Sequence, residues 1–353
     1  MKKSYLMIAI AATLFAACAE NDTFKDVDNQ EVAIDFDGKY VNKVTRAEVT
    51  ETWLNTSGNK FGVFGYKGDL QIFNNEEVTS TGSDWTHNTK RFWDKSATNY
   101  KFYAYAPYTS TTAPTFSTTT GFTFTSSAII TNITTDGADK AIALNAPTSY
   151  AQCCNDHDSH VQFTFNHVFS KLSFMAKVST AADALATIVI KSIKLEFPTA
   201  TAPTWAQTAI GDVAGTTSFG TYTEIDADAS TYTYGTEVYN NSSNTTALTT
   251  SATAIGNTFI VVPVNDDQSV DVPEHVFGVE VTYDLTYKSD SKKETNCKAY
   301  GIIGGGNDAA HQFKPEQNDY YVVTITVDPA QIEFCVEGVE NWDTETAYAV
   351  DVK

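Results

Sequence analysis

Alternation of hydrophobic and polar residues is the dominant pattern of this 353-residue chain. Short alternating or wholly apolar runs are separated by turns rich in Gly, Asn, Ser and Thr, a pattern that predicts β-strands. Helical periodicity is almost absent, apart from one or two turns expected at 181–185. The pattern predicts an all-β protein built of β-sandwiches. The expected strands lie at 31–37, 61–66, 100–108, 161–178, 188–197, 258–264, 276–285 and 320–327.

Composition and charge narrow this picture. The chain has 21 Phe and 18 Tyr against 3 Met, and aromatic residues fit the half-buried surface of a sheet. A chain of this length suits two domains of about 150 residues each. The formal net charge of −20 disfavours binding to nucleic acid, because phosphate backbones repel an acidic surface.

The first residues have the pattern of an export signal. Two lysines precede an apolar run at 5–15, which is too short to span a membrane. Small residues then lead to Cys18, as in a lipobox, so we expect residues 1–17 to be a signal peptide and Cys18 to carry lipid. An ordinary secretory signal cut within one residue of Cys18 is the alternative.

One stretch has the composition of a metal site. Cys153, Cys154, His157 and His160 lie within eight residues and offer thiol and imidazole ligands for zinc. Their spacing matches no zinc-finger or hydrolase pattern, so a solvated loop with no bound metal is the favoured interpretation.

The cysteines leave their redox state open. With Cys18 lipidated, Cys153, Cys154, Cys297 and Cys335 allow three pairings, and free buried thiols are an equal alternative.

Catalytic chemistry has no recognisable motif in the chain. No nucleophile elbow or phosphate loop is present, so we expect neither an enzyme nor a cofactor. His167 is interpreted as a packed histidine that donates to neighbouring backbone. Five tryptophans could stack on sugars if exposed, and Trp205, in a loop rich in Pro and Thr, is the best candidate for exposure.

Several segments together resemble the fimbrillin family, the pilins and adhesin subunits of the Bacteroidota surface. The resemblance implies two transthyretin-like β-sandwich domains, export as a lipoprotein, trimming after Arg46 so that Ala47 becomes the first residue, and assembly by strand exchange. It suggests a lipidated pro-segment at 18–46 and domains at 47–168 and 169–353. The matching segments are the lipobox ending at Cys18 and residues 45–47, 61–66, 102–108, 163–174 and 320–327, followed by Ile332, Val339 and Trp342.

The spacing of apolar residues at both ends suggests how assembly would work. A cut after Arg46 would remove the leading strand and leave an apolar groove with unpaired backbone groups. A neighbour's C-terminal segment, 347–353, could fill that groove by β-strand addition. The alternative is that the C-terminal segment is an ordinary strand of its own domain. The leading strand presents Val32, Ile34 and Phe36 on one face, and the tail presents Tyr348, Val350 and Val352 at the same spacing.

These observations predict a non-enzymatic pilin or tip adhesin at the outer membrane surface and in fimbriae. Its expected partners are other fimbrial subunits, the outer membrane through the lipid before cleavage, and surface receptors or glycans of host or bacterial cells. The first alternative is a surface glycan-binding lipoprotein that stays anchored and does not polymerise. A weaker alternative is a secreted hydrolase with two carboxylates in one cleft.

Overall fold

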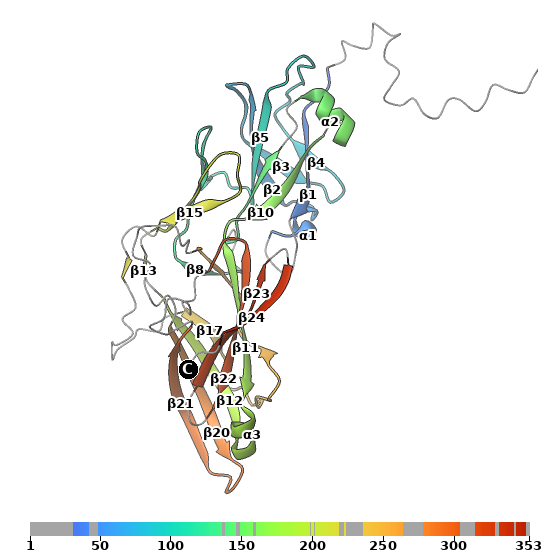
Figure 1. Cartoon of the computed structure of the whole chain (residues 1–353). Helices are drawn as coiled ribbons and strands as arrows, with labels where there is room; N and C mark the ends of the chain where they lie inside the picture. The colour runs from blue at the N-terminus through green and yellow to red at the C-terminus, as the bar shows by residue number, and fades with distance from the viewer. Residues whose placement is uncertain are drawn as a thin grey trace, which may run out of the picture.

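The computed structural model describes residues 31–41, 49–135, 138–145, 149–157, 160–197, 199–200, 202–218, 222–223, 236–263, 278–303, 315–328, 332–341 and 344–350. These residues form an elongated molecule, with the strands of the first half at one end and most strands of the second half at the other (Figure 1). The all-β class expected from the alternating pattern is confirmed.

The first sheet has seven strands and belongs to the first half of the chain. Its first strand, β1, runs parallel to β10, and its other neighbouring strands are antiparallel. The sheet curls so that β1 and β4, which stand at opposite ends of the strand order, lie against each other. In spatial order the strands are β1 (Asp35–Val41), β10 (His160–His167), β9 (Ala141–Asn145), β5 (Tyr100–Ala106), β2 (Lys60–Lys67), β3 (Leu70–Ser80) and β4 (Trp85–His87).

The curled sheet encloses a core rich in aromatic residues, called here the first core. Eight of its nineteen buried members are aromatic, and ring pairs such as Phe61 and Trp85, 4.7 Å between centroids, fill its interior. Its buried members are Ile34, Phe36, Val49, Leu54, Phe61, Val63, Phe73, Val78, Trp93, Tyr100, Phe102, Ala104, Ala106, Ala141, Ala143, Cys153, Val161, Phe163 and Phe165.

Strand β2 is buried on both faces, which explains its apolar and glycine-rich sequence. A Cβ added at Gly62 would lie 2.3 Å from Cε1 of Tyr105, so only glycine lets this ring lie against the strand. The outer face of β2 and β5 packs against a fourth sheet through an aromatic cluster that includes Phe64, Tyr105 and Phe122. The strands of the fourth sheet, in order, are β15 (Gly215–Ser218), β14 (Thr204–Gln207), β7 (Gly121–Thr125) and β6 (Thr115–Ser117).

The second half forms a sandwich of a second and a third sheet around an aliphatic core, called here the second core. Only three of its twenty-three buried members, among the described residues, are aromatic. The second sheet contains β24 (Thr344–Val350), β23 (Ile332–Asn341), β22 (Asp319–Val327), β11 (Ser170–Val178), β19 (Phe259–Val261) and β8 (Ile130–Asn132), with β18 (Thr253–Ala254) paired to β11. The third sheet contains β17 (Thr236–Asn240), β12 (Ala186–Glu196), β20 (Gly278–Tyr287) and β21 (Lys293–Ile302).

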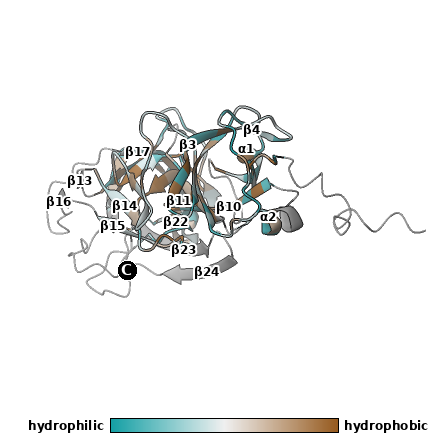
Figure 2. Cartoon of the chain, turned by 90° about the horizontal axis from the view of Figure 1, so that it is seen from above, coloured by the Kyte–Doolittle hydropathy of each residue, from teal (hydrophilic) through white to brown (hydrophobic). Residues whose placement is uncertain are grey.

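Figure 2 shows hydrophobic residues gathered on the strands inside the sheets and hydrophilic residues toward loops and outer strands. A separate short pair is formed by β13 (Thr199–Ala200) and β16 (Tyr222–Thr223). The two halves also interleave, because β7 pairs with β14 and β8 pairs with β19.

The described part of the chain has three short helices, and none of them is long and apolar enough to cross a membrane. The turn expected at 181–185 is α3 (Thr180–Leu185), whose first turn is capped by Ser179 through a 3.0 Å bond to Ala182 N. The others are α1 (Glu51–Leu54) and α2 (Tyr150–His157), and the second replaces the loop expected around Cys153.

The exposure expected for Trp205 is wrong, because this side chain is fully buried. Trp205 lies on β14, paired with Phe124 of β7, and its indole Nε1 donates to Oε1 of Gln317 at 3.3 Å. The Pro- and Thr-rich composition around it belongs to a strand that is covered by distant parts of the chain.

Candidate functional site

Strand β1 and the residues just before it lie between strand β10 and the segment 91–93. On one edge β1 pairs with β10, with Phe36 opposite Val161. On the other edge the preceding residues pair with the segment 91–93: Ile34 N donates to Arg91 O at 2.8 Å, and Trp93 N donates to Val32 O at 2.9 Å. The leading segment is therefore held by backbone bonds on both edges, and β1 also contacts β4.

The inward face of this segment completes the first core. Ile34 is 0% exposed and Phe36 is 1% exposed, while Val32 is partly buried against the same core. The Phe36 ring packs edge-on against Phe73 at 5.0 Å between centroids and also contacts Phe102 at 5.9 Å. The structure thus places all three residues of the expected removable strand against the core.

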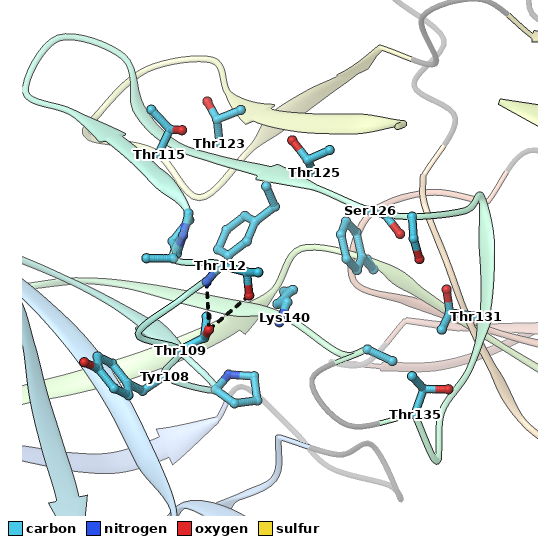
Figure 3. A pocket seen from close by; sticks show the side chains of 17 residues that line it. Tyr108, Thr109, Thr112, Thr115, Thr123, Thr125, Ser126, Thr131, Thr135 and Lys140 are labelled. Carbon is cyan, nitrogen blue, oxygen red and sulfur yellow. Dashed lines mark hydrogen bonds between the residues drawn. The ribbon is translucent and has the colours of Figure 1, made fainter. Parts of the chain in front are cut away.

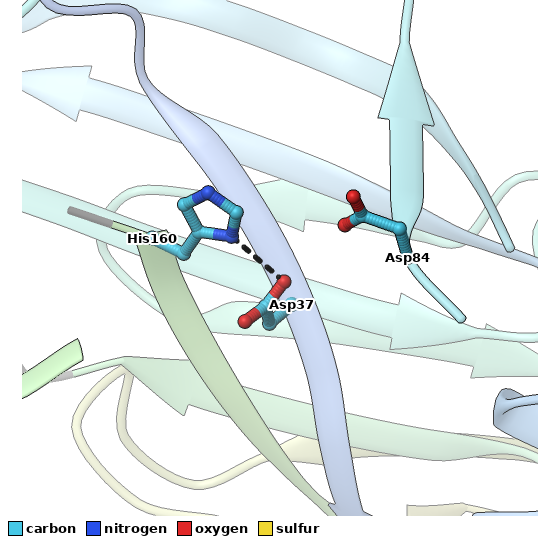
Figure 4. A group of neighbouring side chains, drawn as sticks. All are labelled: Asp37, Asp84 and His160. Carbon is cyan, nitrogen blue, oxygen red and sulfur yellow. Dashed lines mark hydrogen bonds and ion pairs between the residues drawn. The ribbon is translucent and has the colours of Figure 1, made fainter. Parts of the chain in front are cut away.

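The outward face holds the strand through two aspartate–histidine contacts. Asp35 Oδ1 lies 3.3 Å from Nε2 of His87, at the end of β4. Asp37 Oδ1 lies 3.0 Å from Nδ1 of His160, at the start of β10 (Figure 4). Each contact joins β1 to one of the strands beside it, because His160 lies on β10, the sheet partner of β1, and His87 lies on β4, the last strand in the order.

Asp84 extends the second contact into a group with the donors of a metal site. One ligand atom each from Asp37, Asp84 and His160 lies within 4.8 Å of the others, and imidazole with carboxylate suits a transition-metal ion. Asp37 and His160 already bond to each other, and we interpret that contact as structural. The sequence gives no signal for this grouping, because Asp84 is distant from both partners along the chain.

Of the three other candidate ligands in the stretch 153–160, the structure describes the side chain of Cys153 alone. Cys153 is buried in the first core on α2, and the side chains of Cys154 and His157 lie outside the described residues. Cys153 and Cys297 form no disulfide, and burial raises the pKa of the Cys297 thiol. The side chain of Cys335, on β23, also lies outside the described residues.

A buried polar pair anchors the chain where it re-enters the first core. Val49 N donates to Asp139 Oδ2 at 3.0 Å, and Nδ1 of His167 lies 3.0 Å from Asp139 Oδ1. The exposed fractions are 0% for Asp139 and 1% for His167. The burial expected for His167 is observed, but the partner of its Nδ1 here is a carboxylate instead of the expected backbone group. This anchor fixes the backbone three residues after Arg46.

The C-terminal segment lies at the edge of the second sheet. Strand β24 pairs antiparallel with β23, with Val350 opposite Val336, and it is the last strand in the sheet order. Tyr348 and Val350 belong to β24, but their side chains lie outside the described residues, as does the whole of Val352. Cys18, Arg46 and Ala47 also lie outside them.

A model of the fimbrillin-like family matches residues 45–342 of this chain. The chain belongs to the fimbrillin-like family. The resemblance inferred from the sequence is thereby confirmed. The match begins one residue before Arg46 and contains the anchor at Val49 and the strands from β2 to β23, whereas β1 and β24 lie outside it.

Similarity to individual proteins either covers a short part of the chain or is low in sequence identity. The fimbrium subunit Fim1C of Phocaeicola vulgatus is 30% identical over 122 residues, which is 31% of this chain and 31% of that protein. The structure of a fimbrial protein from Bacteroides vulgatus aligns with 90% of this chain and 99% of its own, at 16% identity and a TM-score of 0.47. A candidate cell adhesion protein from Bacteroides uniformis aligns with 88% of this chain and 99% of its own, at 18% identity and a TM-score of 0.44.

Proposed function

We propose that this fimbrillin-like protein is a non-enzymatic structural subunit of cell-surface fimbriae, assembled by protease-triggered strand exchange and supporting adhesion. The single observation that carries the proposal is the position of the leading segment. Ile34 and Phe36 fill part of the first core, while backbone bonds join the leading segment to β10 on one edge and to residues 91–93 on the other.

Removal of this segment would open a slot of defined shape. Burial of an apolar side chain contributes about 1.5–3 kcal/mol to the stability of the fold. The loss of Val32, Ile34 and Phe36 would remove these contributions and expose the apolar groove in which they lie. The strand edges on either side would also lose their hydrogen-bond partners. The anchor at Val49 holds the chain beyond Arg46, so cleavage there would free the leading segment alone.

The tail supplies a candidate occupant. Tyr348, Val350 and Val352 have the spacing of Val32, Ile34 and Phe36, and β24 is an edge strand with one neighbour in the described sheet. A tail that left β23 and entered the slot of another molecule would make a head-to-tail contact that does not close, which builds a filament. The proposed partners are therefore other subunits, reached after export as a lipoprotein modified at Cys18.

The sequence allows a selective experiment, because it contains two arginines, Arg46 and Arg91. The purified precursor should be treated with an arginine-specific protease and examined on a non-boiled gel. We expect a ladder of oligomers and a new N-terminus at Ala47. The Arg46→Lys variant should give no ladder, the matched Arg91→Lys variant should still give one, and a variant lacking 347–353 should be cut but stay monomeric. Clean cleavage at Arg46 that yields monomers alone would overturn the proposal.

A further inference from the structure

A cavity of about 600 Å³ opens beside the fourth sheet. Its walls come from the loop after β5, from β6 and β7, and from residues within 126–135 and 138–140 around β8. Figure 3 shows Thr123 and Thr125 on one wall, Thr109 and Thr112 across from them, and Thr131 on a third side. Most of these lining residues come from 109–127, a stretch of the sequence that is rich in Thr and Ser.

The polarity of the cavity comes from neutral hydroxyl groups. Nine of its seventeen lining residues are Thr or Ser, and Lys140 is the one charged residue among them. None of the described residues that line the cavity is Asp or Glu. A hydroxyl both donates and accepts hydrogen bonds, so this lining matches a ligand that is itself rich in hydroxyls. An anionic ligand would instead call for a cluster of cations.

Aromatic residues give the cavity an apolar surface as well. Phe124 and Phe169 are almost fully buried where they line it, and Tyr108 is partly exposed. Binding sites for small molecules combine such apolar surfaces with a few placed polar groups. The C–H face of a pyranose ring would pack on Tyr108, the partly exposed ring of the lining, while its hydroxyls bond to the threonines.

The walls are fixed before any ligand arrives. Tyr105 Oη donates to Asn75 Oδ1 at 2.8 Å and lies 3.1 Å from Thr109 O, which holds the loop after β5. Thr109 and Thr112 are joined through their Oγ1 atoms at 3.0 Å. Strand β7 is paired with β14, and β8 with β19, so the other two walls belong to sheets. Such preorganisation lowers the ordering cost of binding.

We propose that this cavity is a binding site for a neutral oligosaccharide. Ligand binding in this cavity is separate from strand exchange. It requires neither cleavage at Arg46 nor assembly. It would give the subunit an adhesive contact of its own, with a glycan chain as the ligand class.

The proposal can be tested on the uncleaved, monomeric precursor. Maltotriose, cellotriose, mannotriose and triacetylchitotriose should be screened at millimolar concentration by saturation-transfer NMR and then by calorimetry, with sialyllactose as the acidic comparison. We expect at least one neutral sugar to bind. The Thr123→Val, Thr125→Val double variant should weaken it by about ten-fold, because it loses two hydroxyls and keeps the strand shape. Thr187→Val, on β12 and partly buried like Thr123, should bind as the wild type does.

Three outcomes would overturn the proposal: no binding by any neutral sugar, binding by sialyllactose alone, or unchanged affinity in the double variant. A thermal melt of each variant establishes that it is folded. Failure of this test would leave the protease experiment unaffected, since that experiment scores oligomers and not ligand binding.

Discussion

The two cores of the molecule are built from different residues and depend differently on the ends of the chain. Eight of nineteen buried residues are aromatic in the first core, against three of twenty-three in the second. The first core includes Ile34 and Phe36 from the leading segment, whereas the members of the second core that the structure describes lie between residues 129 and 327. Among the described residues, the aliphatic core therefore takes no member from either end of the chain.

This difference shows how a subunit could lose one strand and still remain folded. Large rings leave a large hole when one of them is withdrawn, so the first core gains most from a replacement strand. Small branched side chains in the second core interdigitate between two sheets, and the described members of this core all come from residues 129–327. The proposed donor and acceptor properties thus belong to opposite ends of one molecule.

The largest expected effect is that of Phe36→Ala. Truncation of a buried phenylalanine typically costs about 3–5 kcal/mol of unfolding free energy, and Phe36 contacts three further phenylalanines in the first core. Hydrogen exchange of the precursor should become faster in β2, β5 and β10 while β12 and β20 keep the wild-type rate.

Phe174→Ala is the matched change in the second core, where Phe174 is 2% exposed. It should speed exchange in β12 and β20 and leave the first sheet unchanged. This pair of variants also tests the proposed domain boundary between 168 and 169. If either variant accelerates exchange equally in both regions, the two cores unfold as one unit and the comparison fails.

Local pattern was sufficient to predict several of the strands that line the two cores. The alternation at 188–197 and 320–327 gave β12 and β22 because each of these strands has one face on the second core. The inward face of Val32, Ile34 and Phe36 followed from the same period of two. These features depend on neighbours within one strand, which a sequence displays directly.

Features that depend on distant segments were not predictable in this way. Trp205 is buried by β7 and bonded to Gln317, and neither partner is near it in the sequence. The closure of the first sheet by contact of β1 with β4 has no local signal either. The helix α2 was missed because its sequence is polar, with Cys153 reaching the first core.

A smaller effect is expected from Asp139→Ala. The change removes the acceptor of Val49 N and the partner of His167 Nδ1, which should cost about 1–3 kcal/mol because buried polar groups lose a bond. Limited proteolysis should then reach residues 49–54 sooner than in the wild type. Asp69→Ala, at an exposed position, is the control and should change stability by less than about 0.5 kcal/mol. Equal protection of residues 49–54 in both variants would show that Asp139 does not anchor the re-entry point.

The smallest expected effect is a difference between the two regions in how stability depends on pH. Burial raises the pKa of Asp319, on β22, to about 6, whereas the Lys67 ammonium and Ser96 hold the pKa of Asp94, beside the first core, below its usual range. Asp319 keeps a proton in the folded state that the unfolded chain releases, so its contribution to stability is present at about pH 4 and is lost as the pH rises through about 6. Asp94 has the opposite sign, because its contribution is present at neutral pH and is lost as the pH falls below the ordinary carboxyl range.

Urea unfolding of Asp319→Asn across about pH 4 to 7 should lack the decline seen in the wild type. Asp94→Asn should retain that decline. Its free energy of unfolding should be lower than that of the wild type at neutral pH, and this difference should shrink toward acid pH. The two carboxylates lie beside different cores. The pH dependence of stability that each one contributes should therefore appear in the hydrogen exchange of its own region. A wild-type profile that rises from pH 4 to 6 in the second region would contradict the raised pKa of the buried Asp319.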